Sequence, residues 1–286
     1  MLTVVVGLAS ALVYGFADFF GGLAARRIRP IPATAAGAVA GVVIGMLALA
    51  LIGGTWSRDA VVLGLLSGAV AAAAVGMLYA CLAIGPMSIL SPLTAVVSAI
   101  VPVVVGLASG EQPGPLGFVA LPLCLVAVVL VGFAPDPQAV RPTGRGILLG
   151  IGAGAAIGTF LVILDSTPED SGAVPLLFNR AANAAVMVLL ATVLIALARR
   201  RAPSGGVPWR QGLPLALAAG TLDTMANAGL LLGVRLGDLS VIAVLTALYP
   251  AGTIILARIV LRERITPLQY VGLGLAVAGG ALLALA

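Results

Sequence analysis

Hydrophobic residues fill most of this chain in long, nearly unbroken runs, which short polar or glycine- and proline-rich joints separate. A membrane-spanning helix needs about 20 apolar residues in succession. Ten runs approach or exceed this length, at residues 2–24, 34–53, 60–84, 88–109, 115–134, 146–164, 173–198, 210–234, 239–261 and 267–286. The pattern therefore predicts an all-α integral membrane protein with ten transmembrane helices.

The joints between the runs indicate where each helix ends. Residues 60–110 carry no charge and are long enough for two spans. We divide them at Gly85-Pro86, because proline cannot extend a helix interior and glycine readily ends a helix. Thr266 and Pro267 are typical of an N-cap and a first helical residue, so the tenth helix should begin there.

A weak internal repeat links the two halves of the chain. When residues 237–286 are aligned with residues 85–134, an offset of 152, identical residues occur at 14 of 50 positions without a gap. Ser88, Thr94, Glu111 and Pro115 are the informative matches, because an apolar composition makes matches of Leu, Ala and Val common. We predict two units, residues 1–137 and 138–286, of five spans each. Since five is odd, the second unit enters the membrane from the opposite side, which gives inverted repeats.

Composition excludes several classes of function. The 286 residues are 61% hydrophobic and only 9% charged, whereas soluble domains carry about 25% charged residues. The chain has no Lys and no His, so it lacks the lysine of phosphate-binding loops and the commonest metal ligand. We expect no cofactor and no metal. We also expect no nucleic-acid partner, because the arginines lie at span ends and not in one patch.

Three ionisable residues stand well inside the predicted spans: Asp18, Arg180 and Asp223. One interpretation is an internal Arg–Asp pair, with Asn side chains bonding across helices. The other is that Asp18 or Asp223 binds substrate or a coupling proton, since buried membrane acids commonly mark transport pathways. Polar neighbours at helical spacing share a face with these residues. The candidates for solute or ion binding are therefore Asp18, Tyr14, Asn179, Arg180, Asn183, Asp223 and Asn227.

Aromatic and proline residues add further candidates. Tyr79 and Tyr249 are expected either to border the same cavity or to serve as packing and interface aromatics. Pro92, Pro102 and Pro250 interrupt the backbone hydrogen bonds of the fourth and ninth spans. They are either tolerated kinks or hinges that let each unit rock.

Glu111 and Glu263 follow the fourth and ninth spans. There a carboxylate can accept hydrogen bonds from the free N–H groups that open the next helix, so we predict a structural role for both. Ser109-Gly110-Glu111 and Leu261-Arg262-Glu263-Arg264, together with Tyr14-Gly15 and the stretch 82–92, resemble motifs of the drug/metabolite transporter superfamily, in particular its EamA-like family. In the second motif Arg262 replaces the usual Gly.

This resemblance implies ten helices in two five-helix repeats and transport of small polar or amphipathic metabolites, amino-acid-like or drug-like, mostly outward. We therefore expect a secondary transporter working by alternating access, with or without coupling to protons, as a monomer or homodimer. Asp223→Asn should then reduce transport more than folding. The rivals are a non-transporting membrane scaffold and a membrane-embedded enzyme, although the chain offers no paired catalytic carboxylates on one helix face.

Arginine counting predicts the orientation in the plasma (inner) membrane. Eleven arginines follow odd-numbered spans and two, Arg58 and Arg235, follow even-numbered spans. Because positively charged short loops stay in the cytoplasm, both termini should face outside. The resemblance instead implies cytoplasmic termini.

Overall fold

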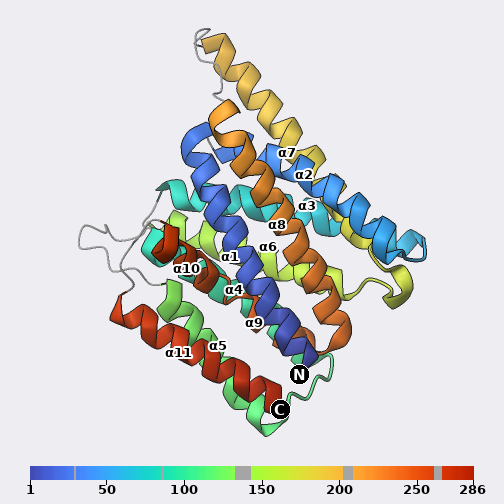
Figure 1. Ribbon diagram of the computed structural model, residues 1–286, viewed down its shortest axis with the longest axis vertical. Helices are drawn as coiled ribbons and strands as arrows, with labels where there is room; N and C mark the ends of the chain where they lie inside the picture. The colour runs from blue at the N-terminus through green and yellow to red at the C-terminus, as the bar shows by residue number, and fades with distance from the viewer. Residues whose placement is uncertain (29, 85–86, 133–142, 202–208, 261–265) are drawn as a thin grey trace.

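The computed structural model describes residues 1–28, 30–84, 87–132, 143–201, 209–260 and 266–286 (Figure 1). These residues are helical almost throughout, with no strand among them. The elements are α1 (Leu2–Ile28), α2 (Pro30–Ile52), α3 (Arg58–Ile84), α4 (Met87–Ala108), α5 (Gly114–Gly132), α6 (Gly144–Asp165), the short 3₁₀ helix η1 (Glu169–Ser171), α7 (Val174–Arg201), α8 (Trp209–Leu236), α9 (Leu239–Thr246), α10 (Pro250–Val260) and α11 (Pro267–Leu285).

Within the described residues, nine stretches are long and apolar enough to cross a membrane by length and composition. One of them, Leu239–Leu256, combines α9 with part of α10. The remaining predicted span is α4, which contributes a shorter apolar stretch, Leu93–Ala108. The prediction of an all-α, multi-pass integral membrane protein is confirmed.

The predicted ninth helix is two helices in the structure, which corrects the sequence prediction. α9 ends at Thr246, and α10 begins at Pro250 after a short turn. Pro250 has no N–H to donate to the carbonyl oxygen of Thr246, and this oxygen instead accepts from the N–H of Tyr249 at 3.0 Å. α4, in contrast, continues past Pro92 and Pro102. Of the three predicted hinges, Pro250 therefore lies at a break in its span.

The start of α11 agrees with its predicted cap. The Thr266 hydroxyl accepts from the N–H of Gln269 (3.3 Å), and the Gln269 side-chain oxygen accepts from the N–H of Thr266 (3.0 Å). Pro267 follows as the first helical residue. This reciprocal capping box satisfies two backbone donors that the first turn would otherwise leave free.

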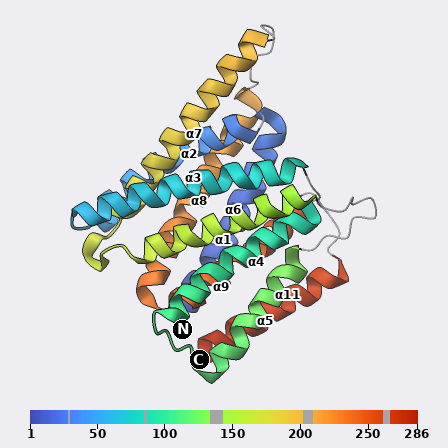
Figure 2. The same ribbon diagram turned by 180° about the vertical axis from the view of Figure 1, so that it is seen from behind.

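Helices of the two halves pack against each other in matching pairs (Figures 1 and 2). α1 packs on α8 and α10, while α6 packs on α3 and α4; α2 packs on α7 and α8, and α7 also packs on α3. α4 packs on α9, and α5 runs beside α11. Exchanging the halves, with α9 and α10 taken together, leaves this set of pairs unchanged. This pairing is the one expected of two equivalent units. The inverted topology of the two units and the boundary between them after residue 137 stay predictions.

α1 and α8 run in opposite directions, which defines two ends of the bundle. At one end the Thr3 hydroxyl donates to the carbonyl oxygen of Leu236 (3.1 Å). At the other end an Arg27 guanidinium N–H donates to the carbonyl oxygen of Gln211 (3.0 Å). Both chain termini lie at the first end (Figures 1 and 2), as an even number of crossings requires. We refer to it as the terminal end.

The crossing of α2 and α8 leaves no room for a side chain. A Cβ atom added to Gly220 would clash with the backbone of Gly37, including its carbonyl oxygen. We expect Gly220→Ala to lower the melting temperature in detergent by on the order of 5 °C, because overpacking a tight contact costs about 1–3 kcal/mol. Gly76→Ala in α3 is the matched control, since a Cβ there meets nothing within 4 Å. Equal melting temperatures for the two variants would contradict this account of the crossing.

Candidate polar site between α1, α3, α7 and α8

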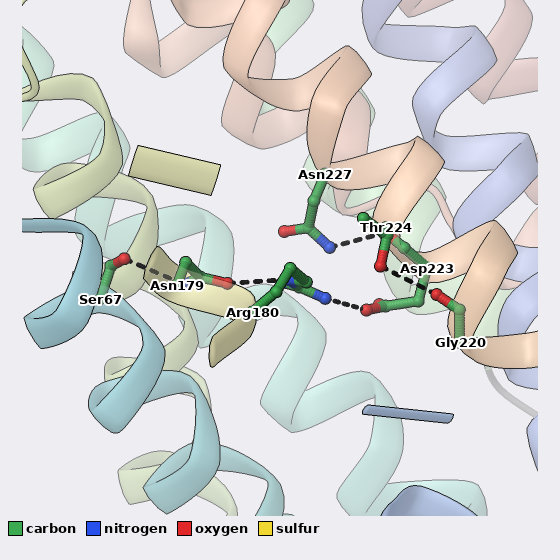
Figure 3. Close-up of polar contacts among 7 residues, drawn as sticks. All are labelled: Ser67, Asn179, Arg180, Gly220, Asp223, Thr224 and Asn227. Atoms are coloured by element: carbon green, nitrogen blue, oxygen red, sulfur yellow. Dashed lines mark hydrogen bonds and ion pairs between the residues drawn. The ribbon is translucent and has the colours of Figure 1, made fainter. Parts of the chain in front are cut away.

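An ion pair lies at the centre of the polar residues. An Arg180 guanidinium N–H of α7 donates to the carboxylate of Asp223 on α8 (Figure 3). The Arg180 side chain is 8% exposed and that of Asp223 is 42% exposed. A second N–H of Arg180, on Nε, donates to the side-chain oxygen of Asn179 at 2.9 Å. The internal Arg–Asp pair, one of the two interpretations of the sequence, is thus present.

The network continues from α7 to α3 through a residue that the sequence prediction missed. The Asn179 amide donates to the Ser67 hydroxyl at 2.9 Å (Figure 3). That hydroxyl donates in turn to the carbonyl oxygen of Gly64 at 2.8 Å. Asn179 and Ser67 are both buried. Asn179 therefore bonds across helices, as expected. Ser67 gave no signal, because a lone serine in an apolar span resembles the many small residues that fill helix contacts.

Asn227 and Thr224 of α8 form hydrogen bonds within their own helix. The Asn227 amide donates to the backbone carbonyl of Asp223 at 2.8 Å, a hydrogen bond that lies within α8. The Thr224 hydroxyl likewise donates to the carbonyl oxygen of Gly220 at 2.9 Å. Asn183 lies half-buried on α7, one turn beyond Asn179.

Asp18 and Tyr14 approach this network from α1. Asp18 is exposed, although its chain neighbours Ala17 and Phe19 are buried. Its carboxylate interacts electrostatically with that of Asp223. Tyr14, one turn earlier and half-buried, interacts with the charges of Asp18, Asp223 and Arg180. The structure thus brings the polar residues of α1, α7 and α8 within electrostatic reach of one another.

The break between α9 and α10 packs directly on α1. A Cβ atom at Gly15 would clash with the carbonyl oxygen of Tyr249, and the Thr253 hydroxyl donates to the carbonyl oxygen of Gly15 at 3.1 Å. Tyr249 itself is half-buried and interacts electrostatically with Asp18. The lack of a side chain at Gly15 therefore lets the break lie next to the polar face of α1. The side chains of Tyr79 and Pro92, and the whole of Glu263, lie outside the described residues.

Glu111 caps a helix, but not the one that the sequence predicted. Its carboxylate oxygens accept from the backbone N–H groups of Leu239 (2.6 Å) and Ser240 (3.1 Å), at the start of α9. The expected partner was α5, the helix that follows Glu111 in the chain. The prediction was wrong because chain order does not show that α4 and α9 lie side by side. Burial and the charge of Glu111 together raise the pKa of the adjacent Asp238.

Two loops are bound to each other at the terminal end. The N–H of Thr55 donates to the carbonyl oxygen of Asp170 and the N–H of Ala173 to that of Gly53, both at 2.9 Å. The Thr55 hydroxyl also donates to the Asp170 carboxylate at 2.5 Å. Arg235, at the end of α8, donates to the carbonyl oxygens of Pro168 and Glu169 and to the Ser171 hydroxyl. The bonds of Gly53 and Thr55 hold the α2–α3 loop against the α6–α7 loop, and Arg235 ties the α6–α7 loop to the end of α8.

Comparison with known proteins gives a family and a fold. Residues 144–285 match the model of the EamA-like transporter family. No curated protein matches the chain significantly. A solved structure titled "Crystal structure of protein" is similar to this chain with a TM-score of 0.73 and 17% sequence identity, over 99% of this chain and 96% of that chain. At this identity the likeness shows a shared fold alone, and it extends over nearly the whole chain.

Proposed function

Because this chain belongs to the EamA-like transporter family, we propose that it is a secondary transporter that exports small polar or amphipathic metabolites, amino-acid-like or drug-like. Its membership makes it a multi-pass membrane transporter of the drug/metabolite type, with a small-molecule solute and surrounding lipid as partners. The finer assignment of solute class, outward direction and alternating access is our proposal. We place the protein in the plasma (inner) membrane, as a monomer or homodimer.

The observation that supports a transport pathway is the set of polar side chains inside the bundle. Ionisable residues at membrane depth are costly, with insertion scales giving about 2.5–3.5 kcal/mol for Arg or Asp at a helix centre. Here Asp18, Arg180 and Asp223 come from α1, α7 and α8, hence from both predicted halves. Asp18 and Asp223 keep accessible carboxylates within reach of each other's charge. A pathway between the halves accounts for accessible acids in this position.

In the proposed mechanism the two halves rock around this polar site, so that it faces one side of the membrane and then the other. The pathway is lined by Tyr14, Asp18 and Tyr249 together with the polar residues of α7 and α8. Pro250, at the break in the ninth span, acts as the hinge that absorbs the change in backbone angle, and Pro92 and Pro102 give α4 a similar freedom. Coupling to protons takes place at the exposed acids.

Flux measurements separate this proposal from its rivals. Purified protein in proteoliposomes should accelerate the entry of radiolabelled amino acids or amines above the rate in empty liposomes. A membrane scaffold would give no flux, and an embedded enzyme would convert the solute in place of moving it. A thermal-shift screen against metabolite classes narrows the solute beforehand, because binding stabilises the folded state according to ligand concentration over Kd.

The distribution of charge supports an orientation with both termini outside. The joints at the terminal end carry two arginines and six acids, which are Asp59, Glu111, Asp165, Glu169, Asp170 and Asp238. Arg235, one of the two arginines, is already bound to the α6–α7 loop. The opposite end carries eleven arginines and two acids, Asp136 and Glu263. The positive-inside bias then places the opposite end in the cytoplasm.

Cysteine labelling tests this orientation. In a background with Cys81→Ala and Cys124→Ala, we place single cysteines at Gln112, which is exposed at the terminal end, and at Gln211, which is exposed at the other end. An impermeant thiol reagent added to intact cells should label Gln112→Cys and spare Gln211→Cys. Permeabilised cells, in which both positions should react, are the control. The reverse labelling pattern would establish the cytoplasmic termini that the family resemblance implies.

A further inference from the structure

A chain of hydrogen bonds joins the backbone of α3 to the charge of Arg180, and every bond in it points the same way. The Arg180 Nε–H donates to the side-chain oxygen of Asn179 (2.9 Å), and the Asn179 amide donates to the Ser67 hydroxyl (2.9 Å) (Figure 3). This hydroxyl donates to the carbonyl oxygen of Gly64 (2.8 Å). The three side chains are buried, so these bonds satisfy polar groups that would be costly to leave unpaired.

The close crossing of α3 and α7 makes this chain of bonds possible. Gly64, Ser67 and Gly68 lie at positions i, i+3 and i+4, hence on one face of α3. A Cβ atom added at Gly68 would clash with the carbonyl oxygen of Asn179, and one at Gly64 would lie 2.8 Å from the carbonyl oxygen of Pro175. The two glycines thus let the backbones approach, and the serine between them supplies the polar group that meets the Asn179 amide.

The aliphatic stem of Arg180 is held from α2. A Cβ atom at Gly41 would lie 3.3 Å from the Cδ of Arg180, and one at Gly45 would lie 3.5 Å from its Cγ. The stem therefore runs along α2 at two positions that have no side chain. α2 and α3 belong to the first predicted half, whereas Arg180 and its partner Asp223 belong to the second. The position of the Arg180 charge thus depends on how the halves pack.

The orientation of the Asn179 amide depends on Ser67. An amide has a donor end and an acceptor end, and only the acceptor end can bind a guanidinium group. Because the Ser67 hydroxyl gives its proton to Gly64, its oxygen can only accept toward Asn179. This turns the NH₂ group of Asn179 toward α3 and its oxygen toward Arg180. Without the hydroxyl, the amide would lose the contact that fixes its donor end.

We propose that Ser67 is a positioning residue of the polar site: through the Asn179 amide it fixes where the positive charge of Arg180 lies beside Asp223. The inference rests on the proposed function, in which this site receives the solute. It assigns to a serine of the first half a role in arranging the charges of the second. Ser67 carries no charge itself, so its effect reaches Asp223 through Asn179 and Arg180.

Charge-selective labelling measures the position of the Arg180 charge. In a protein that lacks Cys81 and Cys124, Asp223→Cys places a thiol beside Arg180, at a position where the native side chain is 42% exposed. Its reaction rates with an anionic sulfonatoethyl and a cationic trimethylammonioethyl methanethiosulfonate are compared. Ser67→Ala should lower the ratio of anionic to cationic rate about tenfold, because a nearby unit charge acts with opposite sign on the two reagents. The ratio cancels changes in thiol ionisation, and Arg180→Gln gives its lower limit.

Two further variants separate positioning from a general loss of structure. Ser98→Ala in α4 is the matched control, since the Ser98 hydroxyl is also buried but bonds to the carbonyl oxygen of Ala95 in its own helix (2.8 Å). It should leave the ratio unchanged. Asn179→Asp replaces the amide by a carboxylate, in which either oxygen can accept from Arg180. In the Asn179→Asp background, Ser67→Ala should therefore no longer lower the ratio.

The positioning role is overturned if Ser67→Ala leaves the ratio unchanged, or if it lowers the ratio as much in the Asn179→Asp background as in its absence. Labelling is measured in detergent and requires no transport. Flux in proteoliposomes can therefore fail while the labelling result stands, and a protein that transports solute with an unchanged ratio would lose only the role of Ser67.

A second measurement applies if Asp223→Cys fails to fold, because it keeps Asp223 in place. Hydrogen exchange at the Arg180 Nε–H is followed by NMR in protein made with isotope-labelled arginine, and the signal is identified by its absence from Arg180→Gln. Ser67→Ala should speed this exchange about tenfold, since opening of the bond exposes the N–H to solvent. Ser98→Ala should not. Equal exchange in wild type and Ser67→Ala would contradict the proposal.

Discussion

Asp223→Asn is expected to destabilise the folded protein by about 3 kcal/mol, since it leaves the buried Arg180 charge without its partner. Breaking a buried pair costs about 3–5 kcal/mol, and we take the lower end because 42% of the Asp223 side chain is exposed and solvent screens part of the interaction. The sequence alone had led us to expect an effect on transport more than on folding. The burial of Arg180 reverses that expectation.

The measurement is a double-mutant comparison in detergent, with thermal unfolding and the yield of monodisperse protein as readouts. Arg180→Gln with Asp223→Asn removes both charges and should recover much of the stability, because neutral replacements of a whole pair are often tolerated. Asp18→Asn should reduce stability less, since no cation depends on it among the described residues. A stable, transport-deficient Asp223→Asn protein would show instead that Asp223 acts in transport and not in holding Arg180.

Linking Thr55 to Asp170 is expected to reduce transport to the background of empty liposomes. In the structure these residues join the α2–α3 and α6–α7 loops across the two predicted halves, with the Thr55 hydroxyl 2.5 Å from the Asp170 carboxylate. If the halves separate at the terminal end in each cycle, a covalent link between these loops must stop the cycle. Arg235 also bonds to the α6–α7 loop, so α8 is joined to these loops at the terminal end as well.

The experiment uses Thr55→Cys with Asp170→Cys in a protein that lacks Cys81 and Cys124. A short bifunctional methanethiosulfonate joins the two thiols, and a reductant releases them, so one sample provides both states. Each single-cysteine variant treated in the same way is the control and should keep its flux. Full flux in the crosslinked protein would show that these loops stay together throughout the cycle.

Local sequence patterns predicted the helices but not their partners. Apolar runs of membrane length determined the spans, and Thr266-Pro267 marked the start of α11, because both features depend on neighbours in the chain. The Arg180–Asp223 pair could be predicted from the sequence, because so few charged residues lie inside the spans. The partner of Glu111 could not be predicted, because its bonds to Leu239 and Ser240 depend on which helices meet in space. Proline alone did not distinguish the break at Pro250 from the continuous helix at Pro102.

The split of the ninth span also divides its attachments. α9 packs on α4, and its first N–H groups bond to Glu111 of the α4–α5 loop. α10 packs chiefly on α1, where Thr253 bonds to Gly15. A displacement of the α4–α5 loop is therefore passed to α9 through hydrogen bonds, while α10 follows α1. In the proposed rocking, the turn before Pro250 is therefore the place in the ninth span where α9 and α10 can shift relative to each other.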